Sequence, residues 1–399
     1  MADYFGDNWQ EEYYVWDCAA GTGNLLIGLN EPYRIWASTI DQADVDVIKD
    51  RIKNGNANLL ESHIFQFDFL NDDFSKCPAE PKKILDDEER RKKLIVYINP
   101  PYAEHSNVKT ISGSGKHKNK VSTSTKIYTE CIHDIKSAAR ELYAQFLYRI
   151  YKYINGCYIA NFSKLKTIQS SNFAEFRNFF SPKLEKLFIV PAKTFDNVKG
   201  EFPIGFFIWN TNITCDFLQF SAQKYDSNGT YIGDKTIYSY KNDRYVIKWL
   251  QKYHDKQQEP VAYLCMVGTD VQHNRYIFIS NSLTENARKE KLFTGITHNN
   301  LIEACIYNTI RHVIPEDWTN DRDQYLYPKD TWESDNLFKT DCLTYTLFTN
   351  KIQVTEGNNN FIPFTEKEVC AKESFESHFM TDYIRGKFNP EKKQCRHTE

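Results

Sequence analysis

The sequence lacks the features that define several classes of protein. Its ten cysteines include no Cys-x-x-Cys pair, and no histidine cluster has the spacing of zinc ligands, so neither a disulfide framework nor a zinc site is expected. No apolar run approaches the ~20 residues that a membrane-spanning helix needs. The first residues lack the charged-then-apolar pattern of a secretory signal. We therefore expect a soluble cytoplasmic protein with reduced thiols and no bound metal.

The chain also lacks a strong net charge. Its 50 Lys and Arg nearly balance its 53 Asp and Glu, for a formal charge of −3 over 399 residues. This balance provides no global attraction to nucleic acid, so affinity for a polyanion requires a local patch. Hydrophobic residues make up 41% of the chain, which suffices for a sizeable core, and the length suggests two or three domains.

Apolar runs alternate with amphipathic or charged stretches in the first half of the chain. The predicted strands are residues 13–16, 34–40, 63–67, 94–98, 157–162, 187–190 and 203–209, and the clearest predicted helices are 41–54 and 132–154. The last two strands fit an antiparallel hairpin that closes one edge of the sheet. This alternation predicts a Rossmann-like, doubly wound and mostly parallel α/β sheet of seven strands.

The regular alternation fades beyond about residue 212. Residues 213–399 are aromatic, loop-rich and mixed in character. We therefore predict one domain over residues 1–212 and a C-terminal α+β region over 213–399.

A glycine turn follows the first predicted strand, in the segment WDCAAGTGNLL that contains Ala19, Gly21, Gly23 and Asn24. Glycine lets the backbone approach a ligand closely, and α/β folds build nucleotide pockets where a strand leads through such a turn into a helix. Asp17 ahead of the turn disfavours phosphate and favours a cationic, phosphate-free cofactor. No Lys-Ser/Thr follows, which argues against an ATPase. A tight turn without a ligand is the alternative.

Two more acidic positions follow the next predicted strands. Asp41 has a spacing from Asp17 that suits a ribose-binding carboxylate, although it could equally cap the helix that begins there. Asp68 could accept a hydrogen bond from an adenine amino group, with Phe69 packed against the ring. Alternatively, Asp68 begins a turn and Phe69 belongs to the core.

The most specific motif is Asn99, Pro100, Pro101 and Tyr102, directly after the fourth predicted strand. The two prolines fix φ and remove two backbone donors. The side-chain oxygen of Asn99 and the carbonyl of Pro100 could together accept both hydrogens of a substrate amino group. Tyr102 offers a flat face on which a planar substrate can stack. At a strand end of this kind, the motif is far more specific than an ordinary turn.

A basic stretch follows this motif. Residues 106–126 carry five lysines and no acidic residue, among many Ser, Thr and Gly. We predict that Lys109, Lys116, Lys118 and Lys120 contact DNA phosphates. An ordinary solvated loop is the alternative.

Taken together, these motifs resemble those of the amino-group DNA methyltransferases, and most of all their N6-adenine branch. The sequence is similar there to the modification portions of type I and type IIG restriction–modification systems and to related phage methylases, over about residues 1–212. The resemblance implies S-adenosylmethionine as cofactor. Asp17, Ala19, Gly21, Gly23 and Asn24 would line its methionine side, Asp41 its ribose, and Asp68 with Phe69 its adenine.

The resemblance also implies how a target base is bound. The NPPY motif would polarise the target amine and stack on a flipped base, because a paired adenine hides its N6 edge inside the duplex. The hairpin around Phe202 would lie beside this pocket, and the C-terminal region would read the DNA sequence. Implied partners are DNA and a restriction or specificity subunit.

The sequence departs from the family pattern at its beginning. Only sixteen residues precede Asp17, where family members carry a further cofactor segment and a helix. We therefore expect the chain to begin inside its domain, with a cofactor pocket open on one side. No nuclease arrangement of the Pro-Asp…Asp/Glu-x-Lys type is present.

Three alternatives remain open. An N4-cytosine DNA methyltransferase could use the same Asn99 motif. Glutamine methyltransferases that act on release factors share it for a side-chain amide, although the basic stretch and the long C-terminal region argue against that class. A DNA-binding module without turnover is the non-enzymatic alternative.

Overall fold

The computed structural model describes residues 1–102, 122–195, 200–239, 245–283, 285, 288, 293–328, 330–348 and 352–353. It divides into two compact units, residues 1–239 and 240–399. The predicted boundary near residue 212 falls inside strand β7, which continues to Thr214. Unit 1 extends further because two more strands, β8 and β9, belong to its sheet.

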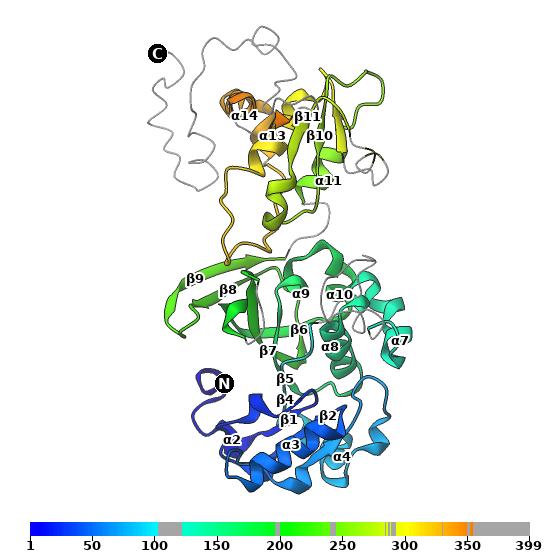
Figure 1. Cartoon of the computed structure of the whole chain (residues 1–399), viewed down its shortest axis with the longest axis vertical. Coiled ribbons are helices and arrows are strands. Elements are labelled where there is room, and N and C mark those ends of the chain that lie inside the picture. The colour runs from blue at the N-terminus through cyan, green and yellow to red at the C-terminus, as the bar shows by residue number, and fades with distance from the viewer. Residues whose placement is uncertain are drawn as a thin grey trace. The chain divides into compact units, whose positions relative to one another are not determined.

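Unit 1 is built on a mixed sheet of nine strands in the order β3-β2-β1-β4-β5-β7-β6-β8-β9 (Figure 1). The strands are β1 (Tyr14–Asp17), β2 (Ile35–Thr39), β3 (Ile64–Gln66), β4 (Leu94–Ile98), β5 (Tyr158–Lys164), β6 (Pro182–Pro191), β7 (Pro203–Thr214), β8 (Gln219–Tyr225) and β9 (Tyr231–Tyr238). β1 to β5 are mutually parallel, and β7 runs antiparallel to both β5 and β6. The mostly parallel α/β sheet is therefore confirmed, but with nine strands instead of seven.

The predicted hairpin exists as β6 and β7, but it does not close the sheet. β8 pairs with β6 in parallel, and β9 pairs with β8. These two strands alternate weakly between buried and exposed residues. For that reason the sequence pattern did not reveal them.

Helices cover both faces of the sheet of unit 1 (Figure 1). They are α1 (Ala2–Phe5), α2 (Trp9–Glu12), α3 (Gln42–Lys53), α4 (Ala79–Asp86), α5 (Glu88–Arg91), α7 (Lys126–Ile135), α8 (Leu142–Tyr153), α9 (Lys166–Gln169) and α10 (Ala174–Phe179). Alternate residues of β1 belong to different faces. Val15 shares a core with Val45 and Ile48 of α3, whereas Trp16 contacts Phe69, which stacks on Phe146 of α8.

The predicted helix over residues 132–154 is interrupted. α7 ends at Ile135, and a 3₁₀ turn over Lys136–Arg140 precedes α8. Lys136 has a φ of 47°, which no α-helix tolerates. Side-chain patterning did not predict this break because the apolar periodicity continues on either side of it.

Unit 2 has its own core and a second sheet in the order β12-β10-β11-β13. Its strands are β10 (Ala262–Cys265), β11 (Phe278–Ser280), β12 (Phe293–Ile296) and β13 (Ile352–Gln353). Its helices are α11 (Val246–Gln251), α13 (Leu301–Ile310) and α14 (Asn336–Phe348). The buried guanidinium of Arg311 donates to the carbonyls of Gly268 and Asp270 and to the side chain of Asn274, so it ties α13 to the loop after β10.

Within the described ranges, no helix is long and apolar enough to cross a membrane. The eight cysteines of those ranges are free thiols, and seven of them are buried.

Candidate functional site

The segments that carry the predicted site residues end at one edge of the sheet. β3, β2, β1 and β4 are neighbours and run parallel, so their carboxyl ends lie side by side. Asp17 ends β1, and Asn99 directly follows β4. Asp41 and Asp68 stand two residues beyond the ends of β2 and β3. The topology therefore brings these four residues to the same edge.

The turn after β1 is held by its own backbone. The N–H of Ala19 donates to Asp17 Oδ1 across 3.0 Å. The N–H of Ala20 donates to the Ser38 carbonyl of β2 across 3.0 Å, and that of Gly23 donates to the Ala20 carbonyl across 2.8 Å. The Ala20 hydrogen bond thus fixes the turn against β2.

Both predicted glycines have the left-handed backbone that favours glycine. Gly21 has a φ of 50° and Gly23 a φ of 80°. A Cβ at Gly23 would lie 3.1 Å from Cγ1 of Ile48, whereas a Cβ at Gly21 would meet nothing within 4 Å. Gly23 is needed for packing against α3. Gly21 instead borders open space, in which a ligand has room.

Asp17 is an almost completely buried carboxylate, with 1% of its surface exposed. Burial raises its pKa to about 7, and the Ala19 N–H opposes this only in part. No cation forms an ion pair with it among the residues that the structure describes. Because an unpaired buried charge is costly, a positively charged ligand beside Asp17 would relieve that cost.

The residues after the turn form a single 3₁₀ turn, η1 (Asn24–Leu26), instead of the expected helix. Asn24 is exposed, and its Oδ1 accepts a hydrogen bond from Arg51 of α3 across 2.6 Å. Asp41 is the residue ahead of α3, but its side chain makes no capping hydrogen bond. Its exposed carboxylate therefore stands at the sheet edge without the capping role.

Asp68 and Phe69 match the alternative interpretation, in which Asp68 begins a turn and Phe69 belongs to the core. Asp68 Oδ1 accepts from the N–H groups of Leu70 and Asn71, and its Oδ2 accepts from the Asn71 side chain across 2.7 Å. Phe69 is 2% exposed and stacks on Phe146 with centroids 5.2 Å apart. Asp68 thus begins a turn. The Phe69 ring is core and cannot contact an adenine in this conformation.

The NPPY segment leaves β4 with one residue that faces solvent. Pro101 is exposed, Pro100 is buried, and Asn99 and Tyr102 are half-buried. The Tyr102 hydroxyl donates to Asn99 Oδ1 across 2.6 Å. Burial raises the pKa of the Tyr102 hydroxyl well above its ordinary value, so it stays a donor at neutral pH. Asn99 Oδ1 is therefore already an acceptor in a partly desolvated place.

Residues near the hairpin gather around Tyr102. Its ring packs, together with Phe202, against a buried cluster of Val190, Ala192 and Ile204. Phe202 is half-buried and lies so close to Gly200 that a Cβ there would be 2.5 Å from Cε1 of the ring. Tyr102 and Phe202 thus pack against the same cluster.

β5 brings two buried polar residues beside this segment. Ile98 of β4 pairs with Asn161 of β5. Asn161 is fully buried and accepts from Trp209 Nε1 across 3.2 Å, while its Nδ2 has no partner among the described residues. Ser163, two residues further, is equally buried. Sequence reasoning missed both residues, although two polar residues in an otherwise apolar strand are a detectable signal.

Arg149 of α8 is a third residue that sequence reasoning missed. It is 5% exposed, and its guanidinium donates to the carbonyls of Phe69 and Asp72. It also lies 4.4 Å from the centroid of Phe74. Arg149 therefore anchors the loop after β3 to α8. An arginine inside an apolar helix was its only signal in the sequence.

The predicted DNA-contacting lysines Lys109, Lys116, Lys118 and Lys120 lie outside the described residues. No cluster of three or more metal-ligating side chains occurs among the residues that the structure describes.

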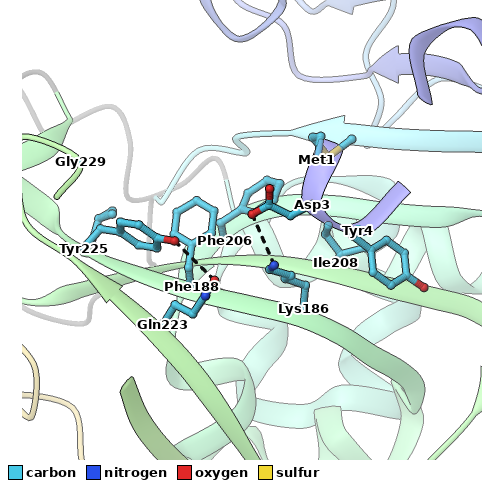
Figure 2. A pocket seen from close by; sticks show the side chains of 11 residues that line it. Met1, Asp3, Tyr4, Lys186, Phe188, Phe206, Ile208, Gln223, Tyr225 and Gly229 are labelled. Carbon is cyan, nitrogen blue, oxygen red and sulfur yellow. Dashed lines mark hydrogen bonds and ion pairs between the residues drawn. The ribbon is translucent and has the colours of Figure 1, made fainter. Parts of the chain in front are cut away.

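A cavity of about 250 Å³ lies on the α3-bearing face of the sheet (Figure 2). Its wall is formed by β6, β7, β8 and the first residues of the chain: Met1, Asp3, Tyr4, Lys186, Phe188, Val190, Phe206, Ile208, Gln223, Tyr225 and Gly229. The Lys186 ammonium lies 3.5 Å from the Asp3 carboxylate at its rim. None of the predicted site residues lines this cavity, so it is separate from the edge described above.

Neither a protein family nor a curated protein sequence matches the chain. Similar solved structures include a DrdV–DNA complex, with 16% identity, a TM-score of 0.38, and coverage of 58% of this chain and 26% of that one. The methyltransferase subunit of a type I restriction–modification system from Streptococcus thermophilus has 13% identity and a TM-score of 0.38, with 73% and 55% covered.

A putative class I S-adenosylmethionine-dependent methyltransferase from Listeria monocytogenes is also similar, with 12% identity, a TM-score of 0.33, and 54% and 58% covered. The chain spans only 26% of the DrdV chain and 23% of a similar structure, the ATP-dependent Type ISP restriction-modification enzyme LlaBIII bound to DNA. Likeness at this level carries no argument about activity, which has to come from the site itself.

Proposed function

We propose that the chain is an S-adenosylmethionine-dependent DNA methyltransferase that acts on the exocyclic N6 of adenine. The observation that carries the proposal is the pair of groups on adjacent strands: a buried carboxylate at the end of β1 that pairs with no cation among the described residues, and a half-buried amide acceptor directly after β4. The first suits a cationic cofactor, and the second suits an amine.

The residues present fit S-adenosylmethionine. Asp17 would face its positive charge, the open space at Gly21 would admit its methionine end, and the exposed Asp41 would bind its ribose. When bound, the cofactor supplies an activated methyl group. Asp68 and Phe69 shape the adjacent loop through the contacts described above, so the cofactor's adenine has to be held by other residues of this edge.

The chain's own contribution to the reaction is positioning. Asn99 Oδ1 and the Pro100 carbonyl would accept the two hydrogens of the target amine, which directs its nitrogen lone pair towards the methyl carbon. No strong base is needed at first, because the nitrogen attacks an already activated group. Orientation in a partly desolvated site then supplies most of the rate enhancement.

Base flipping would be balanced by stacking. Extruding a base costs a few kcal/mol, and one aromatic stack returns about 1–3 kcal/mol. Tyr102 would supply that stack, with Phe202 beside it. The four lysines between 109 and 120 would bind phosphates, and unit 2 would read the sequence, in a restriction–modification or phage context with a separate restriction or specificity subunit.

The direct test is to incubate the full chain with S-adenosylmethionine and mixed-sequence DNA and to quantify modified nucleosides by mass spectrometry. We expect N6-methyladenine, with at least a hundredfold loss in Asn99→Ala. Asn178→Ala changes an exposed asparagine on α10 and should leave the yield unchanged.

N4-methylcytosine as the product would keep the mechanism and change the base. Methylated glutamine on a protein substrate, with unmodified DNA, would move the chain to the release-factor class. DNA binding without cofactor binding or product would make it a non-catalytic module.

A further inference from the structure

The Tyr102 hydroxyl is hydrogen-bonded to Asn99 Oδ1, which is the atom that the proposed function assigns to the target amine. Its O–H donates to Asn99 Oδ1 across 2.6 Å, and both side chains are half-buried. A buried acceptor without a donor costs about 1–3 kcal/mol. The hydroxyl therefore satisfies Asn99 and holds its amide in place while no substrate is bound.

The protein holds the Tyr102 ring in this position from two sides. Tyr143 of α8 makes an edge-to-face contact with it, with centroids 6.4 Å apart, and is itself fully buried. The cluster of Val190, Ala192 and Ile204 packs against it from β6 and β7. Ring surface in contact with protein is not available to a base. Stacking on a flipped base thus requires the ring to move.

We propose that Tyr102 is a placeholder whose hydroxyl saturates Asn99 Oδ1 until the amine of the target base displaces it. In the exchange, one O–H···O bond is replaced by one N–H···O bond, and the released ring becomes free to stack. Asn99 Oδ1 stays paired throughout. The inference rests on the proposed function and assigns to the hydroxyl a role separate from the stacking of the ring.

The exchange also contributes to specificity. A base with an exocyclic amine at this position displaces the hydroxyl at little net cost. A base without that amine either leaves Tyr102 in place and forgoes the stack, or displaces it and leaves Oδ1 unpaired. Sites that hydrogen-bond a substrate group discriminate in this way against analogues that lack it.

Two nucleosides separate the amine from the ring. The probes are 2′-deoxyadenosine and purine 2′-deoxyriboside, which differ only in the 6-amino group, and Tyr102→Phe removes the hydroxyl but keeps the aromatic ring. Calorimetry or ligand-observed NMR on the full chain should show tighter binding of deoxyadenosine to Tyr102→Phe by about 2–10-fold, because no hydroxyl has to be displaced. Purine deoxyriboside should tighten by a similar factor, because its stacking no longer requires a hydroxyl to leave Asn99 Oδ1, but it should bind more weakly than deoxyadenosine to both proteins because it has no amine for that oxygen.

The matched control is Tyr151→Phe. It removes a tyrosine hydroxyl on α8 that lies 3.3 Å from Ser181 Oγ. It should alter neither affinity. Tyr102→Leu removes ring and hydroxyl together and should weaken both nucleosides alike. Melting curves identify any variant that has lost its fold.

Binding of deoxyadenosine to Tyr102→Phe that is equal to that of the wild type, weaker or undetectable overturns the placeholder, and so does equal affinity of the wild type for the two nucleosides. The readout does not depend on turnover. Loss of methylation in Asn99→Ala with unchanged nucleoside binding in Tyr102→Phe would leave the proposed function standing and remove only this inference.

Discussion

The Asp17 carboxyl group ends β1 with 1% of its surface exposed, and the Ala19 N–H is its donor. Burial raises its pKa to about 7. It therefore changes charge near neutral pH, whereas an exposed aspartate does so near pH 4. Ionisation of Asp17 should strengthen the binding of a cationic cofactor but lower the stability of the folded protein.

The affinity for S-adenosylmethionine should depend on pH. Below about pH 7, Asp17 is protonated in the free protein and a cationic ligand has to ionise it, so affinity should fall by up to about tenfold per pH unit. Above pH 8 the affinity should be constant. Calorimetry between pH 5.5 and 8.5 measures this, with S-adenosylhomocysteine, which lacks the sulfonium charge, as the control ligand, for which the dependence should be smaller.

Asp17→Asn provides the matched variant. It should bind S-adenosylmethionine more weakly at pH 8 and show a flat profile. The raised pKa means that the ionised side chain opposes folding, so wild-type stability should fall as the pH rises from about 4 to 7. The Asp17→Asn variant should therefore be at least as stable as the wild type at pH 8. A steep cofactor profile that persists in the variant would assign the titration to another group.

At the scale of elements, the strands were easier to predict than the helices around them. β4 is a short apolar run, buried at nearly every position, and such runs stand out in a sequence. The turn after β1 was equally visible through Asp17 and its glycines. The helix expected after it is absent, because the chain passes through η1 to a third left-handed glycine, Gly28, with a φ of 89°.

The roles of Asp68 and Phe69 show why motif residues are harder to place than strands. Side-chain type does not say which way a residue points. Phe69 turned inward because Phe146 and Arg149 of α8 contact it, and residues eighty positions away are not visible in local patterning. The hydrogen bond between Tyr102 and Asn99 was not predicted either, because residue type alone does not say which way the two side chains point.

The two glycines of the β1 turn should respond differently to substitution. Gly23→Ala combines a φ of 80° with a Cβ 3.1 Å from Ile48, so it should lower the free energy of unfolding by about 2–4 kcal/mol. Gly21→Ala adds a methyl group to open space and should cost only about 1 kcal/mol. Denaturant titration measures both effects.

The same pair should show the opposite order in ligand binding. The methyl group of Gly21→Ala fills space that the proposed cofactor needs, so the affinity for S-adenosylmethionine should fall at least tenfold in a folded protein. Unchanged cofactor affinity in Gly21→Ala would remove this turn from the cofactor site.

At the scale of the whole molecule, charge and domain organisation decide how DNA would be bound. Because the formal charge of the chain is −3, attraction to DNA phosphates has to come from local basic groups. Residues 106–126 hold five lysines and no acidic residue, so they are the proposed source of this local attraction.

Replacing Lys109, Lys116, Lys118 and Lys120 with Gln should weaken DNA binding and reduce its dependence on salt. Each lost phosphate contact lowers the slope of log K against log salt by about 0.9 on duplex DNA, so the slope should fall by about 2–4. Fluorescence anisotropy between 50 and 300 mM salt measures it. Cofactor affinity is the control and should not change, whereas an unaltered slope would make the stretch an ordinary solvated loop.

The boundary of unit 1 predicts which fragments fold. A chain ending at residue 212 loses the end of β7 and all of β8 and β9, so Phe188 and Ile189 of β6 lose their parallel partners. It also exposes the sheet surface that the buried Ala222 and Ile237 cover. Residues 1–239 keep the sheet whole. We expect the longer fragment to melt cooperatively and the shorter one to aggregate or melt at least about 5 °C lower.

The fragments also separate the two proposed roles of the chain. Because Asp17, Gly21 and Asp41 all belong to unit 1, residues 1–239 should bind S-adenosylmethionine within about threefold of the full chain. If unit 2 reads DNA, the same fragment should lose most methylation of duplex DNA while it keeps the cofactor. Full methylation by residues 1–239 would place target recognition inside unit 1. Cofactor binding that needs unit 2 would instead mean that the edge of β1 to β4 is an incomplete site.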